Sequence, residues 1–470
     1  MGKIKYRATD ELKYSGVEWL GEIPKKWGIP KIKYNSIKIT QGPNPNYDLG
    51  ISDENSKYKV LKTKDVYDDV IYYNSADSIT FYTYKGCIKA KLKNDDILIG
   101  IVGKGSIGKV NVFKYKGGLQ FIFTRALGLI RVNRNSINPY FLNYVFRSNY
   151  GKEIINFGII GSTGQEVLQT AFISDIKFPM PKISEQNILC NFLDIKIAQF
   201  DFIISKKEQL IQKLEEAKKS LISEVVTGKL KIVDGDTVKR QPGEMKESGI
   251  EWIGLIPRGW AVKKLGYLLN FKNGVNADAG QYGNGIKFIN VKEVIDNDIL
   301  TYQQIPNKVK ISKQKIAENI VVNGDVLFNR TSETAEEIGM TTVYKDCERV
   351  VFGGFVIRGR EIKNDLILNF KRYCFNSIEV RKQLISYASG SIRKNIGQGN
   401  LKNVYLTFPE KSEQELITNY LIDKERELIN IIKKSQLQIQ RLRQAKQSLI
   451  SEAVTGKIDL KDWGIIEEGE

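Results

Sequence analysis

The chain contains no histidine among its 470 residues. Histidine is the side chain used most often for acid–base catalysis near neutral pH, and its absence excludes Ser-His-Asp and Cys-His catalytic systems. Cysteine is scarce, and the four cysteines, at positions 87, 190, 347 and 374, show no Cys-x-x-Cys spacing. We therefore expect buried packing thiols, no metal site and no catalytic centre of these classes.

Long apolar runs are also missing. No stretch approaches the roughly 20 apolar residues that a membrane-spanning helix needs, and the first residues, MGKIKYRATDELKYSG, lack the apolar core of a signal peptide. These absences predict a cytoplasmic protein with no membrane partner. The apolar content of 41% predicts a folded chain, and the length favours about three domains, or two domains with extended elements.

Acidic residues are outnumbered by basic ones. The chain has 72 lysines and arginines against 54 aspartates and glutamates, which gives a net charge of +18. The surplus is concentrated, because residues 85–134 hold eleven basic side chains and two acidic ones. Such clustering predicts binding to a polyanion with an affinity that falls as the salt concentration rises.

The sequence contains an internal repeat. KYSGVEWLGEIPKKW at 13–27 returns as KESGIEWIGLIPRGW at 246–260. The segment 184–229, which begins SEQ and ends SEVVTGK, returns at 412–457 as a segment that begins SEQ and ends SEAVTGK. This ABAB order predicts two similar halves, each made of a globular part followed by a long helix.

The second segment of each half is predicted to be a long helix. Each follows a proline closely, runs for about 40 residues without proline or glycine, and stops at Thr-Gly. Apolar residues recur every seven positions, which is typical of a coiled-coil seam, and the nearest partner for each helix is the other one, in antiparallel orientation. The alternative, in which each helix lies on its own domain, stays open. The seam residues are Leu193, Phe200, Leu214 and Leu221 in the first helix and Leu421, Leu428, Leu442 and Leu449 in the second.

The globular segments are predicted to be mixed α/β domains, because strand-like runs such as DILIGIV and RALGLIRV alternate with turns. A helix is expected to start at Asn138, with Pro139 in its first position. The predicted fold class is α/β (α+β): two mixed domains joined by two long antiparallel helices, with an internal pseudo-twofold repeat. The expected boundaries are 1–183 (domain), 184–230 (helix), 231–245 (linker), 246–411 (domain), 412–458 (helix) and 459–470 (acidic tail).

The stretch DDILIGIVGKGSIGKV, residues 95–110, has the glycine spacing of a dinucleotide-binding loop, and Lys109 nearly completes a P-loop. However, Val110 stands where a P-loop carries Ser or Thr, and the residues that follow predict strands instead of a phosphate-binding helix. The repeated half keeps only Gly339 of these glycines. We therefore expect a tight strand-to-strand turn that presents Lys104, Ser106 and Lys109 to a groove.

The two SGxEWxGxIPxxW segments, the DILI…GSIGK turn and the two SEQ…SLISExVTGK helices resemble the DNA specificity subunit of Type I restriction-modification systems, over essentially the whole chain. The resemblance implies that 1–183 and 246–411 are target recognition domains, each reading one half of an asymmetric bipartite site in double-stranded DNA. It implies that the helices set the half-site distance and dock two methyltransferase (modification) subunits, with restriction (translocase/nuclease) subunits as further partners. No catalytic centre and no cofactor are implied for this chain, whereas S-adenosylmethionine, ATP and Mg²⁺ are implied for the partner subunits.

DNA contacts are expected from basic, amide and hydroxyl side chains in the turns. Arginine can pair with guanine, and asparagine or glutamine with adenine, whereas lysines more often hold phosphates. In the first half the candidates are Lys62, Lys64, Lys104, Ser106, Lys109, Arg125, Ser162, Thr163 and Gln165. In the second half they are Asn290, Lys292, Asn329, Arg330, Ser332, Ser391, Arg393, Lys394 and Asn395.

Two other functions stay open. One is a coiled-coil adaptor that binds only protein, and the clustered positive charge argues against it. The other is a metal-dependent nuclease that would use Asp95, Asp96 and Lys104. Such a nuclease would need a Glu-x-Lys on the next strand, and KVNVFKYKGG has none.

Overall fold

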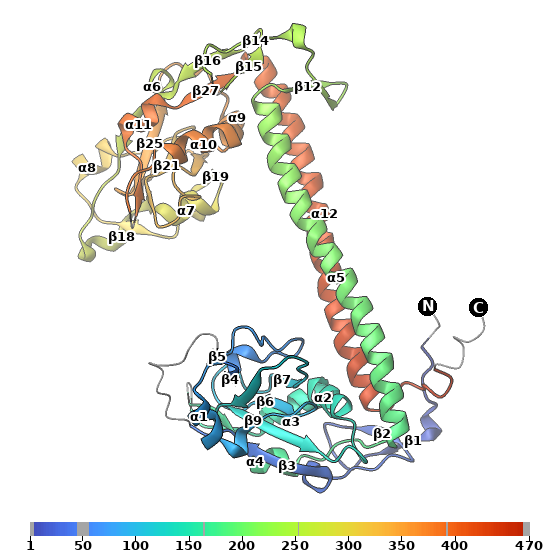
Figure 1. Cartoon of the computed structure of the whole chain (residues 1–470). Coiled ribbons are helices and arrows are strands. Elements are labelled where there is room, and N and C mark those ends of the chain that lie inside the picture. Colours follow the sequence, from blue (N-terminus) through green and yellow to red (C-terminus); the bar gives the residue numbers. More distant parts are fainter. Residues whose placement is uncertain (1–3, 45–55, 163–164, 252, 392, 464–470) are drawn as a thin grey trace. The chain divides into compact units, whose positions relative to one another are not determined.

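The computed structural model describes residues 4–44, 56–162, 165–251, 253–391 and 393–463. The chain folds into two compact units (Figure 1). Unit 1 comprises Met1–Lys207 and Leu437–Glu470, and unit 2 comprises Glu208–Gln436. Each unit contains one globular part, called head one or head two, and one part of each of two long helices. The acidic tail from residue 464 lies outside the described residues.

Head one is built on a four-stranded antiparallel sheet, in the order β3-β9-β6-β7, beside a three-stranded sheet, in the order β5-β4-β8. The strands are β3 (Ser36–Gln41), β4 (Tyr58–Leu61), β5 (Asp77–Ser78), β6 (Ile97–Gly100), β7 (Val110–Val112), β8 (Gln120–Phe123) and β9 (Leu127–Val132). The helices are α1 (Phe81–Gly86), α2 (Pro139–Arg147), α3 (Asn149–Phe157) and α4 (Thr170–Asp175), and two hairpins pair β1 (Leu12–Tyr14) with β2 (Glu22–Pro24) and β10 (Ile159–Ile160) with β11 (Val167–Leu168).

The central strand β6 explains how head one is layered. Its side chains alternate between the two faces of the sheet, as they must in a strand. Ile97 and Ile99 belong to the core that includes residues of α2, whereas Leu98 belongs to a second core that includes residues of the three-stranded sheet. An unbroken apolar run was therefore required here, because both faces of β6 are buried.

Head two repeats this plan. Its larger sheet has the order β17-β25-β21-β23-β19, and a three-stranded sheet has the order β20-β18-β24. These strands are β17 (Leu269–Asn273), β18 (Tyr282–Ile289), β19 (Ile299–Leu300), β20 (Lys308–Val309), β21 (Val326–Asn329), β23 (Thr341–Tyr344), β24 (Val351–Phe352) and β25 (Val356–Glu361). The internal repeat predicted from the sequence is thus present in the strand order of both heads, and β19 is an addition in head two.

Unit 2 contains further helices and strand pairs. Its helices are α6 (Leu265–Leu268), α7 (Val291–Asp296), α8 (Lys313–Glu318), α9 (Leu368–Cys374), α10 (Ile378–Ser386) and α11 (Gln398–Asn403). Four strand pairs complete it: β12 (Leu230–Val233) with β13 (Asp236–Lys239), β14 (Met245–Glu247) with β15 (Leu255–Pro257), β16 (Ala261–Lys264) with β27 (Tyr405–Phe408), and β22 (Thr331–Ser332) with β26 (Lys394–Asn395). The segment expected as a linker, 231–245, therefore contains most of the β12–β13 hairpin.

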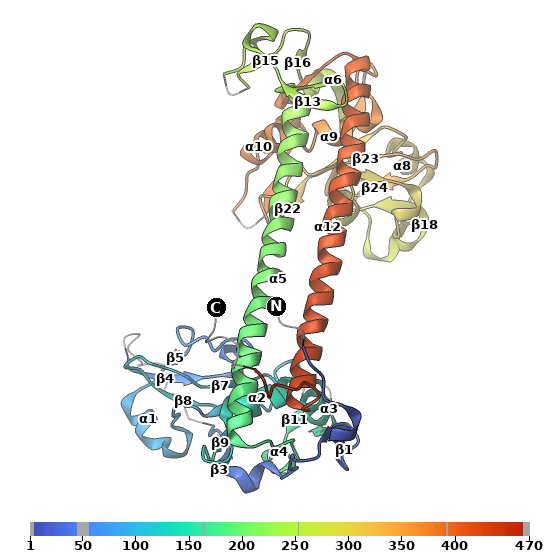
Figure 2. The ribbon, with the colours of Figure 1, turned by 90° about the vertical axis from the view of Figure 1, so that its right-hand side faces the viewer.

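The two long helices, α5 (Ile183–Val226) and α12 (Lys411–Val454), lie side by side within each unit (Figure 1 and Figure 2). In unit 1, Lys207 Nζ donates to Gln438 Oε1 at 2.6 Å, and Lys446 Nζ donates to Asp201 Oδ1 at 2.6 Å. Residue numbers rise along one helix as they fall along the other, which confirms the predicted antiparallel pair. Three seam residues are buried in the cores of the units, Leu193 and Leu449 in unit 1 and Leu421 in unit 2, and the other five are half-buried.

The start of each long helix is held by the last tryptophan of a repeated SGxEWxGxIPxxW segment and by an arginine that precedes this segment. In unit 1, Glu185 accepts hydrogen bonds from Arg7 Nη2 at 2.7 Å and from Trp27 Nε1 at 3.1 Å. In unit 2, Glu413 accepts them from Arg240 and from Trp260 Nε1, the latter at 3.0 Å. The Trp of each IPxxW segment and the Glu of each Ser-Glu-Gln therefore recur because they bind each other.

Replacing Glu413 by alanine is expected to lower the free energy of unfolding by about 2 kcal/mol, because two charge-assisted hydrogen bonds are lost and Arg240 stays largely buried. Urea unfolding followed by circular dichroism measures the change. Glu415, an exposed residue on the same helix, is the matched control, and its replacement should change stability by about 0.5 kcal/mol or less. Equal losses in the two variants would contradict the role assigned to Glu413.

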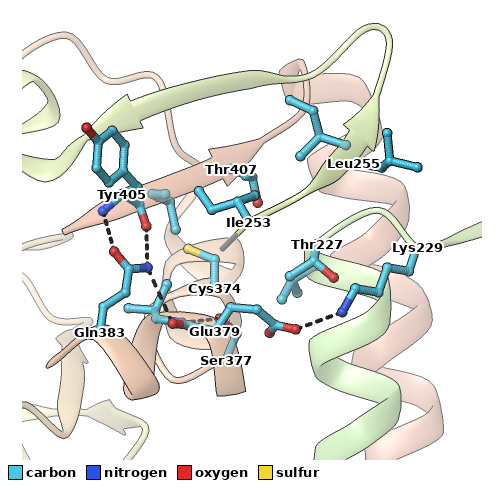
Figure 3. A pocket seen from close by; sticks show the side chains of 14 residues that line it. Thr227, Lys229, Ile253, Leu255, Cys374, Ser377, Glu379, Gln383, Tyr405 and Thr407 are labelled. Carbon is cyan, nitrogen blue, oxygen red and sulfur yellow. Dashed lines mark hydrogen bonds and ion pairs between the residues drawn. The ribbon is translucent and has the colours of Figure 1, made fainter. Parts of the chain in front are cut away.

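Head two meets the end of α5 beside a small pocket (Figure 3). Ser223 on α5 donates its hydroxyl to Glu379, and Lys229 Nζ lies 3.0 Å from Glu379 Oε1. The Gln383 side chain bonds both backbone groups of Tyr405 on β27: it accepts from Tyr405 N at 2.7 Å and donates to Tyr405 O at 2.9 Å. These polar contacts fix the N-terminal part of α10 against the C-terminal end of α5.

Candidate nucleic-acid interface

The glycine-rich stretch after β6 forms the predicted strand-to-strand turn. Gly100 N donates to Lys109 O at 2.8 Å, and the strand that follows, β7, pairs antiparallel with β6. Gly103, Gly105 and Gly108 have φ values of +95°, +74° and +85°, a left-handed conformation that glycine adopts without steric cost. No helix follows the turn directly, so it does not have the architecture of a P-loop or a dinucleotide-binding loop.

Three backbone hydrogen bonds bring the candidate segments of head one together. Thr124 N donates to Leu61 O at 3.2 Å, Ile101 N to Ala126 O at 2.9 Å, and Leu168 N to Ile101 O at 2.8 Å. The segment after β4, the β8–β9 turn, the glycine turn and the β10–β11 hairpin are thereby neighbours. We call these residues, 62–64, 101–109, 124–126 and the described part of 160–168, the loop edge of unit 1.

The same three bonds recur in head two. Gly353 N donates to Ile289 O at 2.9 Å, Arg330 N to Phe355 O at 2.9 Å, and Ile396 N to Arg330 O at 3.0 Å. The loop edge of unit 2 accordingly consists of 290–292, 330–339, 353–355 and the described part of 389–396. The backbone arrangement is shared, whereas the side chains on the two loop edges differ.

Four candidates of unit 1 are exposed on its loop edge: Lys104, Arg125, Ser162 and Gln165. The others are engaged with neighbours. Lys62 and Lys64 both pair with Asp77; burial alone would raise the pKa of this carboxyl, but the hydrogen bonds from the two lysines outweigh burial and lower it. The Lys109 ammonium lies 4.2 Å from the centre of the Tyr67 ring, and Ser106 is half-buried. Thr163 lies outside the described residues.

Two candidates of unit 2 are buried and serve the turn itself. Asn329 Nδ2 donates to Glu337 O at 2.8 Å, and Ser332 Oγ donates to Glu337 Oε2 at 2.5 Å. Asn329 is 0% exposed and Ser332 8% exposed. These side chains satisfy polar groups inside the turn. Contrary to the expectation from the sequence, they are not presented to a ligand, and we leave them out of the interface.

The remaining candidates of unit 2 lie at or near its surface. Arg330 is half-buried and donates to Gly354 O at 3.2 Å, and Arg393 pairs with the exposed Glu333 at 3.4 Å. β22 and β26 pair antiparallel, which places Lys394 opposite Ser332 and Asn395 opposite Thr331. Asn290 caps α7 by accepting from Val291 N at 2.9 Å, and Lys292 and Ser391 are exposed.

The sequence did not indicate Phe355, which is 55% exposed beside Arg330 on the loop edge of unit 2. The position equivalent to it in unit 1, by the shared hydrogen bond, is Ala126. The only available signal was an aromatic residue directly after Gly353-Gly354, a turn in which a bulky side chain has little to pack against.

The carboxylates considered for a nuclease have structural partners. Asp96 is 1% exposed and accepts two hydrogen bonds from Arg131, both at 2.6 Å, and Asp325 and Arg360 form the same pair in unit 2 at 2.8 and 2.7 Å. Asp95 pairs with Arg134 at 2.8 Å. Within the described residues, His, Cys, Asp and Glu form no group of three or more that could hold a metal ion. The arrangement thus offers no support for nuclease chemistry.

The cysteines do not all follow the expectation of buried thiols. Cys190 and Cys374 are buried, and burial raises the pKa of both thiols. Cys87 is half-buried, but Cys347 is exposed, so the expectation is wrong at that position.

The family model for the Type I restriction modification DNA specificity domain matches the chain twice, over residues 37–216 and 257–441. The chain belongs to this family. Relatives extend over nearly its full length. The putative type I restriction enzyme MjaX specificity subunit of Methanocaldococcus jannaschii is 24% identical over 94% of this chain and 96% of its own, and the MjaIX specificity subunit of the same organism is 21% identical over 98% and 99%.

Solved structures from studies of Type I restriction-modification proteins share the fold. A chain from a study of complex assembly and conformational transition of the type I R-M system has a TM-score of 0.69 at 15% identity, covering 93% of this chain and 99% of that one. The HsdS subunit from Thermoanaerobacter tengcongensis has a TM-score of 0.52 at 15% identity, covering 93% and 98%. The resemblance inferred from the repeated segments is thereby confirmed.

Family membership decides the general function. The chain is a specificity subunit of a Type I restriction-modification system, a DNA-recognition component without catalytic activity of its own, and it acts with DNA and partner subunits. Within the part of the chain that the structure describes, no helix has both the length and the apolar character needed to cross a bilayer.

Proposed function

We propose that each loop edge reads one half of an asymmetric bipartite site in double-stranded DNA. One observation carries the proposal: the two heads build the same backbone arrangement and line it with different side chains. Equivalent frames predict equivalent approaches to DNA, and different side chains predict different bases. The target recognition domains are then 1–183 and 246–411, with 231–245 between the first long helix and the second domain and 459–470 as a tail.

The candidates on the loop edges divide by chemistry. Lys62, Lys64, Lys104 and Lys109 suit phosphates, as do Lys292 and Lys394 in unit 2. Arg125, Arg330 and Arg393 suit guanine, whereas Gln165, Asn290 and Asn395 suit adenine. The hydroxyls of Ser106, Ser162, Thr163 and Ser391 can bond either bases or phosphates.

We further propose that the long helices hold the half-sites apart and dock two methyltransferase subunits. Apolar side chains are exposed at two pairs of equivalent positions, Ile188 with Leu416 and Ile203 with Ile431, and their exposed fractions lie between 36% and 49%. A surface that occurs twice can bind two copies of one partner. S-adenosylmethionine, ATP and Mg²⁺ would then be bound by the methyltransferase and restriction subunits in the cytoplasm, not by this chain.

To test this function, the chain is co-purified with its methyltransferase and used to capture DNA. The methylated adenines are then located by sequencing. A single enriched bipartite motif is expected. Exchanging residues 246–411 for the corresponding head of another specificity subunit should change one half of the motif and leave the other half intact. A change in both halves would refute the division into two readers, and methylated product formed by the isolated chain would refute its non-catalytic role.

A further inference from the structure

Each unit contains a network of four charged side chains where its head meets the long helices. In unit 1, Arg147 Nη2 lies 2.7 Å from Asp69 Oδ1, and Lys446 Nζ lies 2.6 Å from Asp201 Oδ1 and 3.9 Å from Asp69 Oδ1. The two cationic side chains are only 12% and 15% exposed, so they depend on these carboxylates for compensation of their charge. We call the four residues the latch of unit 1.

The latch of unit 2 consists of Lys218, Asp298, Arg372 and Glu425. Lys218 Nζ lies 2.9 Å from Glu425 Oε1, Arg372 pairs with Glu425, and Arg372 Nη2 lies 3.9 Å from Asp298 Oδ2. Tyr373 adds a hydrogen bond from its hydroxyl to Glu425 Oε2 at 3.1 Å. As in unit 1, one acid comes from a loop of the head, one cation from a helix of the head, and the other two members from α5 and α12.

Two members of each latch, the acid in the loop of the head and the lysine on the long helix, occupy equivalent positions in the repeat. Asp69 and Asp298 are separated by the same interval as Asp96 and Asp325, which form the same buried pair with arginine in both heads. The lysines at 446 and 218 are separated by the same interval as the two Ser-Glu-Gln segments.

The other two members of each latch, the arginine of the head and the acid on the long helix, do not occupy equivalent positions in the repeat. The residue equivalent to Arg147 in unit 2 is Asn376, and the residue equivalent to Arg372 in unit 1 is Asn143. The acid on the long helix has also moved by one helical turn between the two units. Two diverged heads thus carry the same alternating charges at the same junction from different residues, which indicates that the junction itself is required.

The latches connect to the loop edges through short segments. Asp69 adjoins Asp68, whose Oδ1 accepts from Val110 N at 3.0 Å. In unit 2 the carbonyl of Asp298 accepts from Val343 N at 3.1 Å. Val110 and Val343 lie on β7 and β23, the strands that leave the loop-edge turns. In each unit the latch acid therefore lies in a short segment that connects the helix pair to the strand leaving the loop-edge turn.

We propose that the latches set which spacing between half-sites the chain accepts, an inference that rests on the proposed function. Neighbouring base pairs in B-DNA are about 3.4 Å apart and rotated by about 34°, as the 10 to 10.5 pairs in each turn of 34–36 Å require. A head that tilted on the helices by a few ångströms would meet a neighbouring base pair. The latches prevent such tilting, so they are positioning residues for specificity and not DNA contacts.

The test uses the complete complex of this chain with its methyltransferase and a set of DNA targets. The targets carry the two half-sites of the wild-type motif, separated by the natural spacer or by a spacer one or two base pairs longer or shorter. Methylation is measured for the wild type and for Asp69→Asn, Lys446→Met, Lys446→Arg and Lys218→Met. The control is Arg426→Gln, which removes an exposed ion pair with Asp423 on the same helix, α12.

For Asp69→Asn, Lys446→Met and Lys218→Met we expect methylation at altered spacers to rise about fivefold relative to the natural spacer, the factor that corresponds to about 1 kcal/mol. The bases of both half-sites stay unchanged, and Lys446→Arg and Arg426→Gln keep the wild-type spacing. An unchanged spacing profile would overturn the inference, whether total methylation falls or not. Asp69 keeps this decision open even if a lysine variant fails to fold, because its side chain is 69% exposed. A wild-type complex that methylates no bipartite site would instead refute the proposed function, and the latch role with it.

Discussion

Replacing Lys371 by leucine is expected to lower the free energy of unfolding by about 3 to 5 kcal/mol. The Lys371 side chain is 5% exposed, its Nζ lies 2.7 Å from Glu361 Oε2, and it donates to Gly324 O at 3.0 Å. The Glu361 side chain is 9% exposed. Leucine would leave this carboxylate buried without its cation, and a buried unpaired charge is among the most destabilising changes that a single substitution can make.

The double variant Lys371→Leu with Glu361→Val is expected to recover most of that loss. The equivalent positions of unit 1 hold Leu142 and Val132, both buried, which shows that the same scaffold accepts an apolar pair there. Replacing both members of a buried ion pair by apolar residues is often neutral or stabilising. Urea unfolding of the wild type, both single variants and the double variant forms a complete cycle. A double variant that loses the sum of the single losses would contradict this account.

Replacing Lys104 and Lys109 by glutamine is expected to weaken DNA binding about 60-fold at 0.1 M salt. Each phosphate contact contributes about 0.9 to the slope of log affinity against log salt concentration, and hence about 0.9 decade at 0.1 M. The slope should therefore fall by about 1.8, while the recognised bases stay the same, because phosphate contacts carry no sequence information. Titration of labelled DNA at several salt concentrations measures both quantities.

The control for this experiment removes the same charge elsewhere in unit 1. Lys196 and Lys206 lie on α5, where their ammonium groups lie 5.5 Å from the ring centres of Trp463 and Phe202. Their replacement by glutamine should change the salt slope by much less than the loop-edge variant. Equal slopes for the two variants would mean that net charge, and not the loop edge, governs binding.

The repeat made much of the architecture predictable from the sequence. The turn after β6 could be told from a phosphate-binding loop because its second copy lacks the glycines, and the helix start at Asn138-Pro139 is confirmed, since Asn138 accepts from Tyr140 N. The antiparallel helix pair followed from the seven-residue spacing and from the position of each helix after a domain. These features depend on local sequence or on the repeat, so one sequence contains enough information for them.

Side-chain orientation in the turns was not predictable in the same way. Asn329 and Ser332 have the chemistry of base-reading residues, but both donate hydrogen bonds to Glu337 within the same turn. Ser332 also lies opposite Lys394 of the distant strand β26, a pairing that only the fold brings about. Lys371 reads as an exposed helix residue, and its burial depends on Glu361 from a separate strand. The sequence contains these residues but not the pairing that turns each of them inward.

The loop edges are held by backbone amides and carbonyls, and this has a consequence for evolution. Since bonds such as Ile101 N to Ala126 O do not depend on side-chain identity, exposed residues on this frame can be exchanged at little cost in stability. Under the proposed function, substitutions that change the recognised DNA sequence therefore do not compete with folding. Under the same proposal, new targets can arise by substitution at a few exposed positions, while the glycines with left-handed φ values keep the path of the chain fixed.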